Sequence, residues 1–201
     1  MTALPLPYDV LSDGPLREAG PFSRTFAALG VADFHGACRW LQALPYGRNS
    51  RSDDLMVLFE DGCGTCTTKH GVAAALAEEL GLPARKYIVF YRLDERIRAG
   101  IEAHLATAGV EFVPNTHCVL GEGGRFADLT HGNRTGKRKD LVDFELYVQV
   151  EPGFTADEQA ELYDWGVLWY RRRYETLRRH NVRSIRALRR TCLEAPVLCD
   201  C

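Results

Sequence analysis

The sequence lacks any apolar run close to the ~18 residues that a membrane-crossing helix requires. Its first residues, MTALPLPYDVLSDGP, have neither the basic segment nor the long apolar stretch of a signal peptide. An excess of one charge is also missing, because 25 Lys and Arg balance 27 Asp and Glu. This balance excludes a polycation that coats nucleic acid through its total charge. We therefore expect a cytoplasmic protein that does not enter membranes.

Internal repeats and low-complexity tracts are absent as well, and 201 residues that are 46% hydrophobic suffice for one full core. Seven cysteines, an odd number in such a chain, argue against an oxidised disulfide scaffold and for reduced thiols. We predict a single domain over residues 1–201. Its predicted parts are an extended N-terminal arm at 1–30, a core at about 50–150, helices at 155–193 and a tail at 194–201.

Helical and strand patterns alternate without a regular βαβ rhythm, which favours an α+β fold. Apolar spacing, start signals and stop signals predict helices at 33–44, 65–80, 94–108 and about 155–177. Runs of β-branched and aromatic residues predict strands at 85–92, 111–120, 125–130 and 143–150, with a polar loop at 131–140. The short run LMVLF at 55–59 fits a strand or a buried helix equally well.

Cys66 is the last residue of the glycine-rich segment DGCGTC (61–66) and lies at the predicted start of a helix. The positive end of the helix dipole favours a thiolate there, and a thiolate is the nucleophilic form of cysteine. Gly62 and Gly64 leave backbone N–H groups open to a bound carbonyl oxygen. On a helical wheel Cys66 heads the apolar stripe that packs on a sheet. The alternative is a structural cysteine, since buried cysteines are common.

His117 and Asp128 lie on the two strands that flank the turn GEGG. If that turn pairs Leu120 with Arg125, the same register places His117 opposite Asp128. Directly opposed side chains have Cβ atoms roughly 4.5–5.5 Å apart, so the carboxylate can orient the imidazole. The other imidazole nitrogen is then available to Cys66, which gives a nucleophile, a base and an orienting group.

Four motifs together resemble the transglutaminase-like superfamily of papain-like cysteine enzymes: GTCTTKH (64–70), ELGLPAR (79–85), PNTHCVL (114–120) and FADLT (126–130). The resemblance covers about residues 50–150 and implies a papain-like core, in which the cysteine helix packs on an antiparallel sheet. It implies Cys66 as nucleophile, His117 as base and Asp128 as orienting residue, with the Cys66 backbone N–H in the oxyanion site. This chain departs from the usual family pattern in having Cys118 after the histidine, where an aromatic residue is frequent.

We therefore predict a cysteine enzyme that cleaves or transfers an acyl group from a peptide, another amide or a thioester through a Cys66 acyl intermediate. No cofactor and no metal are expected. The sequence leaves open the acyl acceptor, the oligomeric state and whether the chain is an active or an inactive family member. It also leaves open the second oxyanion donor, for which Asn49 and Asn115 are candidates by residue type.

Three other interpretations stay open at this point. Cys63-Gly-Thr-Cys66 before a helix fits a thioredoxin-like oxidoreductase, in which Cys63 attacks and Cys66 resolves. Cys63, Cys66, His70 and Cys118 are possible zinc ligands, although their spacing is not a standard one. Residues 171–190 carry nine Arg against one Glu, which fits a nucleic-acid-binding module. We instead expect solvated faces of amphipathic helices, with some Arg paired to Asp157, Glu158, Glu161 and Asp164.

Overall fold

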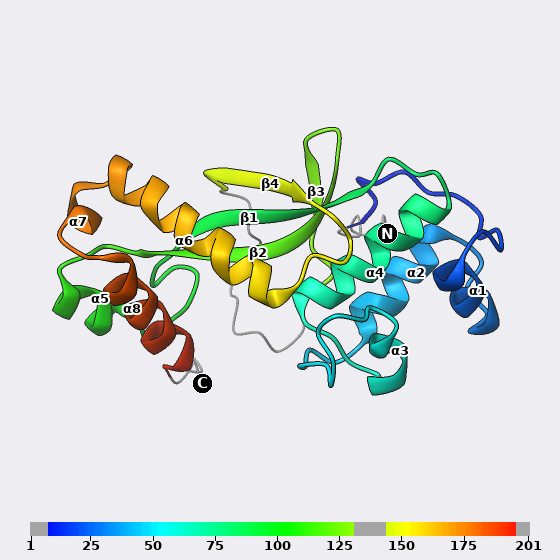
Figure 1. The fold of residues 1–201 in the computed structure, drawn as a ribbon, viewed down its shortest axis with the longest axis horizontal. Helices are drawn as coiled ribbons and strands as arrows, with labels where there is room; N and C mark the ends of the chain where they lie inside the picture. The colour runs from blue at the N-terminus through cyan, green and yellow to red at the C-terminus, as the bar shows by residue number, and fades with distance from the viewer. Residues whose placement is uncertain (1–7, 131–143, 196–201) are drawn as a thin grey trace, which may run out of the picture. The chain divides into compact units, whose positions relative to one another are not determined.

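The computed structural model describes residues 8–130 and 144–195. Its helices are α1 (Pro21–Ala28), α2 (Phe34–Ala43), α3 (Val57–Asp61), α4 (Cys66–Glu79), α5 (Glu102–Ala108), α6 (Ala156–Arg173), α7 (Glu175–Arg178) and α8 (Val182–Glu194). Its strands are β1 (Arg85–Leu93), β2 (Val113–Glu122), β3 (Arg125–Ala127) and β4 (Leu146–Val150). The strands form a four-stranded antiparallel sheet in the order β3-β2-β1-β4, which confirms the predicted α+β class (Figure 1).

Residues 1–7, 131–143 and 196–201 fall outside these described ranges, so the start of the predicted N-terminal arm, the predicted polar loop at 131–140 and most of the predicted tail lie there. Within the described ranges, none of the helices is both long and apolar enough to span a bilayer. Contacts divide the chain into two compact units. The first unit comprises Met1–Ile88, His117–Thr135 and Val148–Ala156, and the second comprises Val89–Thr116, Gly136–Tyr147 and Asp157–Cys201. Strands β1, β2 and β4 each run from one unit into the other, and the single domain over 1–201 stays a prediction.

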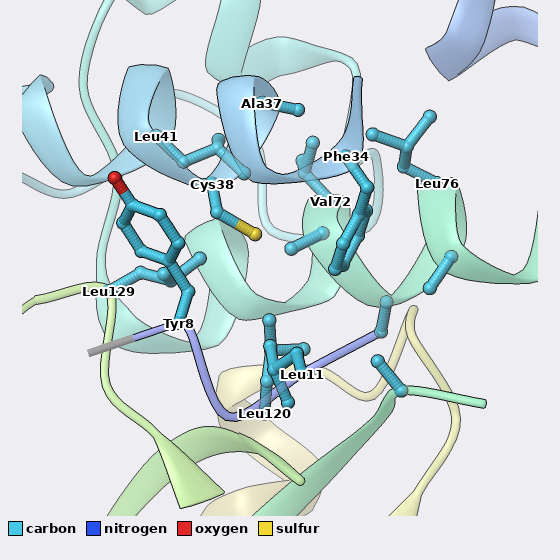
Figure 2. Close-up of a cluster of buried hydrophobic side chains, with 14 of the residues drawn as sticks. Tyr8, Leu11, Phe34, Ala37, Cys38, Leu41, Val72, Leu76, Leu120 and Leu129 are labelled. Atoms are coloured by element: carbon cyan, nitrogen blue, oxygen red, sulfur yellow. The ribbon is translucent and has the colours of Figure 1, made fainter. Parts of the chain in front are cut away.

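The core of the first unit lies where α2 and α4 pack on each other and on the sheet. Figure 2 shows Phe34 and Leu41 of α2 with Val72 and Leu76 of α4 around one cluster, together with Leu120 of β2. All five side chains are fully buried. Small residues fill much of the remaining surface of α4, so neighbouring elements approach it on several sides. This packing fixes the start of α4, and therefore Cys66, within the unit.

The extended arm predicted at 1–30 is wrong for residues 21–28, which form α1. The α1 helix begins at Pro21, and the carboxylate of Glu79 at the end of α4 accepts from the Phe22 N–H at 3.0 Å and the Ser23 N–H at 2.7 Å. A carboxylate at this end of a helix satisfies N–H groups that have no partner inside the helix. Because Glu79 is distant from α1 in the sequence, no local sequence pattern predicts this cap.

Two predicted segments differ in length or type. The ambiguous run at 55–59 contributes to α3, which ends at Gly62 with a φ of 63°. The helix predicted at 94–108 begins only at Glu102, because the Glu95 carboxylate accepts from the N–H groups of Gly100, Ile101 and Glu102 at 2.7–2.8 Å. Glu95 thus caps a short helix in the second unit instead of lying within a long one.

The hairpin of β2 and β3 has a different register from the predicted one. Its pairs are Leu120 with Ala127 and Glu122 with Arg125, so the predicted pairing of Leu120 with Arg125 is wrong. The chain turns at Gly123 and Gly124, whose φ values of 56° and 80° suit a two-residue hairpin turn. Strand β3 ends before Asp128, which therefore does not pair with His117 in the ladder.

Arginines of the basic stretch in the second unit take part in its internal packing. Arg186 forms an ion pair with Asp164 at 2.5 Å, and Asp164 is one of the four acidic residues predicted to pair with arginines of this stretch. Arg189 donates to Asn115 at 2.6 Å and lies 4.6 Å from the centre of the Tyr163 ring. These arginines join helices α6 and α8 to the second unit's part of β2.

Candidate active site

Cys66 is the first residue of α4 and follows the extended N-cap residue Thr65. Its side chain is buried, with 9% of the residue exposed. A hydrogen bond from the Cys118 thiol and the charge and hydrogen bonding of His117 lower the pKa of Cys66 well below its usual range, against the opposing effect of burial. The thiolate expected at this helix start is therefore favoured by its neighbours.

His117 lies on β2 and is 4% exposed. Its Nε2 lies 2.9 Å from Oδ2 of Asp128. The other oxygen of Asp128 accepts from the Thr130 N–H at 2.8 Å and from the Thr130 hydroxyl at 2.6 Å, which fixes the carboxylate. Because Nε2 faces Asp128, Nδ1 is the nitrogen that can exchange a proton with Cys66. The first unit thus brings Cys66, His117 and Asp128 together, despite the shifted register.

His70 lies one turn after Cys66 and is fully buried. Its Nε2 accepts from the Leu129 N–H at 2.8 Å, so Nδ1 carries the proton and donates to the Cys66 carbonyl oxygen at 2.8 Å. Burial lowers the pKa of His70 to about 4, so the ring is neutral near pH 7. Both ring nitrogens are engaged in these bonds. Within the described residues, no three His, Cys, Asp or Glu form a group that could hold a metal.

Tyr46 is a site residue that the sequence analysis missed. Its hydroxyl donates to Sγ of Cys66 at 3.8 Å, and 45% of the residue is exposed. Burial around the hydroxyl and the adjacent Cys66 raise the pKa of Tyr46, so the hydroxyl keeps its proton. No local motif marks a tyrosine twenty positions before the cysteine, because only the folded chain brings the two together.

The segment around Tyr46 is fastened to the start of α4. The Gly64 N–H donates to the Pro45 carbonyl at 3.2 Å, and the Gly47 N–H donates to the Gly64 carbonyl at 3.4 Å. The buried Lys69 adds a third link, because its Nζ donates to the carbonyl oxygen of Leu44 at 2.5 Å. These bonds fix the backbone immediately before and after Tyr46.

The two asparagines considered as oxyanion donors are engaged in other hydrogen bonds. Asn49 donates to Asp61 at 3.2 Å and to the Cys63 carbonyl at 2.9 Å. Asn115 belongs to the second unit, where it donates to the Tyr91 hydroxyl at 2.5 Å and accepts from Arg189. Both amides therefore have structural partners.

Cys63 and Cys118 differ in their surroundings. Cys63 is partly exposed, and its Sγ lies 3.8 Å from the Arg48 carbonyl oxygen. Cys118 is fully buried, and its Sγ lies 3.5 Å from Oγ1 of Thr67. Burial, followed by hydrogen bonding with Cys66, raises the pKa of Cys118 well above its usual range. Neither of them, nor Cys66, forms a disulfide.

One of the comparisons with known proteins found a match. Residues 27–120 match the family described as the transglutaminase-like superfamily. These residues therefore contain a region that is similar to that superfamily. The match confirms the family that the motifs indicated, and it includes Cys66 and His117 but ends before Asp128. No curated protein and no solved structure matches the chain.

Transglutaminase-like proteins are typically cysteine-based acyltransferases or proteases. The matched region begins earlier than the predicted core, because it includes α2, and it ends with Leu120 on β2. The thioredoxin-like alternative built on Cys63 and Cys66 receives no support from the family match.

Proposed function

We propose that this transglutaminase-like chain is a cysteine hydrolase or acyltransferase that forms an acyl intermediate on Cys66. The observation that carries the proposal is the hydrogen-bonded series from Asp128 to His117, 2.9 Å apart, and from His117 to a cysteine whose pKa is lowered. Such a series supplies a nucleophile, a proton carrier and a group that orients the carrier.

The reaction would begin from a Cys66 thiolate beside a protonated His117. The sulfur attacks the carbonyl carbon of an amide or thioester, and His117 Nδ1 gives its proton to the departing nitrogen or sulfur. Asp128 accepts from the Nε2–H of His117 and stabilises the positive imidazolium while it lasts. Water or a second nucleophile then loses a proton to Nδ1 as it attacks the acyl group and releases Cys66.

Two donors are placed to bind the negative oxygen of the tetrahedral intermediate. The backbone N–H of Cys66 lies in the first turn of α4, where N–H groups have no partner within the helix. The Tyr46 hydroxyl rests against Sγ of Cys66 and is fixed by the bonds on either side of it. We propose that this hydroxyl turns from the sulfur to the oxyanion when the sulfur bonds to the carbonyl carbon and the tetrahedral intermediate forms.

The substrate class that this chemistry serves is a peptide, another amide or a thioester. The test uses p-nitrophenyl acetate, a generic acyl donor, with the full chain in its reduced form. We expect a burst of about one equivalent of nitrophenolate and an acetyl group on Cys66 by peptide mass mapping. Cys66→Ala should abolish both, whereas the control Cys63→Ser should retain both. Acetylation of Cys63 at the same rate as Cys66, or a burst that persists in Cys66→Ala, would contradict the proposal.

A further inference from the structure

Two thiols that lie far apart in the sequence meet in the first unit. Cys118 follows His117 on β2, and its Sγ lies 3.5 Å from Oγ1 of Thr67, the residue after Cys66 in α4. The hydrogen bond between Cys118 and Cys66 is also the first cause of the lowered pKa of Cys66. The two sulfurs are therefore neighbours across the contact between α4 and β2.

The two thiols have opposite chemical character. Cys66 is favoured as an anion and is 9% exposed, whereas Cys118 is fully buried and favoured as a neutral thiol. A thiolate reacts with peroxides, and a neutral, inaccessible thiol does not. The proposed acyl transfer needs only one sulfur, so it gives Cys118 no covalent role. A reactive thiolate beside a second thiol is the arrangement of an oxidisable cysteine and its resolving partner.

We propose that Cys66 and Cys118 form an oxidisable pair that a hydroperoxide converts into a disulfide and a dithiol restores. This inference rests on the proposed function, because its consequence is the reversible loss of the Cys66 nucleophile. The hydrogen bond between the two thiols and the position of Cys118 beside Thr67 carry it. The pair replaces the Cys63 and Cys66 pair that the C-x-x-C spacing suggested, since the Cys63 sulfur lies against the Arg48 carbonyl.

Each step balances in atoms and electrons. The Cys66 thiolate attacks the outer oxygen of a hydroperoxide, so an S–O bond forms, the O–O bond breaks and the departing alkoxide or hydroxide takes a proton. Cys66 is now a sulfenic acid, oxidised by two electrons. The Cys118 sulfur attacks the Cys66 sulfur, the S–O bond breaks, and hydroxide leaves as water with the Cys118 proton. A dithiol reverses the result by thiol exchange, and the dithiol is itself oxidised to a disulfide.

The experiment treats the full reduced chain with hydrogen peroxide and maps its peptides without reduction. We expect a crosslink between the peptides of Cys66 and Cys118, loss of iodoacetamide labelling at Cys66, and recovery of that labelling with dithiothreitol. Cys63→Ser is the matched control and should form the same crosslink. A Cys63 to Cys66 disulfide, or oxidation of Cys66 to its sulfinic acid without any disulfide in the native sequence, would overturn the inference.

Variants at Cys118 supply the second arm. In Cys118→Ser and Cys118→Ala, peroxide should oxidise Cys66 to sulfinic acid. The fraction of Cys66 labelling that dithiothreitol recovers should then be at least about tenfold smaller than in the native sequence. Equal recovery would overturn the inference. If both variants fail to fold, the peptide map of the native sequence still decides the question. Failure of the proposed function would show separately, as an absence of acetylated Cys66 in the reduced chain.

Discussion

Tyr46 is the residue whose proposed role the geometry defines most narrowly, because its hydroxyl donates to the sulfur of Cys66, the proposed nucleophile, and has no counterpart among the predicted site residues. Hydrogen bonding to a thiolate and hydrogen bonding to an oxyanion have different kinetic consequences. Alkylation by iodoacetamide displaces iodide at carbon and forms no oxyanion, whereas acylation by an ester forms one. The two reagents therefore separate the two roles of the same hydroxyl.

We predict that Tyr46→Phe slows acylation of Cys66 by p-nitrophenyl acetate roughly 10-fold to 100-fold, the order of loss expected for one oxyanion donor. Alkylation by iodoacetamide should change by less than about threefold, because the substitution leaves His117 and Cys118 in place. Stopped-flow release of nitrophenolate and mass mapping of the alkylated peptide measure the two rates. An equal loss of rate in both reactions would show that the Tyr46 hydroxyl acts only on the Cys66 thiolate and not on the oxyanion.

Asp128 sets which nitrogen of His117 carries the proton. In Asp128→Asn, the Thr130 N–H and hydroxyl retain the amide oxygen, which turns the amide NH₂ toward His117 Nε2. Nε2 must then accept, so Nδ1 keeps a proton and cannot take one from Cys66. We predict that alkylation of Cys66 at pH 6.5 falls at least ~10-fold and that its pH midpoint moves upward.

Rates of iodoacetamide labelling from pH 5 to 9 measure this change. The control is Glu60→Gln, which removes an exposed carboxylate paired with Arg51 and should leave the profile unchanged. A profile for Asp128→Asn that coincides with that of the control would exclude an orienting role for Asp128.

At the scale of elements, His70 joins α4 to the segment after β3 through one donated and one accepted hydrogen bond. The bond that Nε2 accepts from the Leu129 N–H needs the neutral ring, whose pKa lies at about 4 in the fold and at 6.5 ordinarily. At pH values between 4 and 6.5, the His70 ring therefore binds a proton in the unfolded chain but not in the folded chain. The folded state has its full stability above pH 6.5 and loses stability as the pH falls toward 4. Asp128, 3.7 Å away, and the His117 ring face the same imidazole.

We predict that this group alone removes roughly 3 kcal/mol of unfolding free energy between pH 6.5 and 4. His70→Gln should be less stable at pH 7 but should lose less stability on acidification. Urea unfolding at pH 7, 5.5 and 4.5 measures both effects. Parallel losses in the two proteins would show that other groups, and not His70, account for the acid sensitivity.

Glu79 joins two helices, because it ends α4 and caps the start of α1. We predict that Glu79→Gln lowers the unfolding free energy by about 1 kcal/mol, since a neutral amide oxygen accepts more weakly than a carboxylate and lacks its charge. The adjacent Glu78 is exposed, and Glu78→Gln is the matched control, with an expected change within ~0.5 kcal/mol. Thermal or urea unfolding measures the difference, and equal effects of the two substitutions would refute the capping role.

For the whole molecule, the sequence was informative wherever the signal was local. Helix stop signals and strand composition placed α4 and β1 within a few residues of their observed bounds, and the motifs indicated the family. Residue types also sufficed to select Cys66, His117 and Asp128 as the residues to examine. Each of these inferences depends on residues that are close together in the chain.

The features that escaped prediction depend on contacts between distant segments. The α1 helix is capped by Glu79, and Tyr46 is held by bonds to Gly64 and Lys69, none of which leaves a local pattern. The hairpin register failed for another reason: the sequence GEGG offers several two-residue turns, and the observed one uses two glycines with positive φ.

The hairpin explains why an incorrect register still led to a histidine and an aspartate that form a hydrogen bond. Side chains alternate between the two faces of a sheet, so a slip of one residue reverses every face and a slip of two restores it. The observed pairing differs from the predicted one by two, so the residues of β3 keep their predicted faces, and Asp128, directly after β3, lies within hydrogen-bond distance of His117. The juxtaposition is therefore sensitive to whether the number of turn residues is even or odd. Chains of this kind should tolerate a lengthening of the Gly123-Gly124 turn by two residues better than by one.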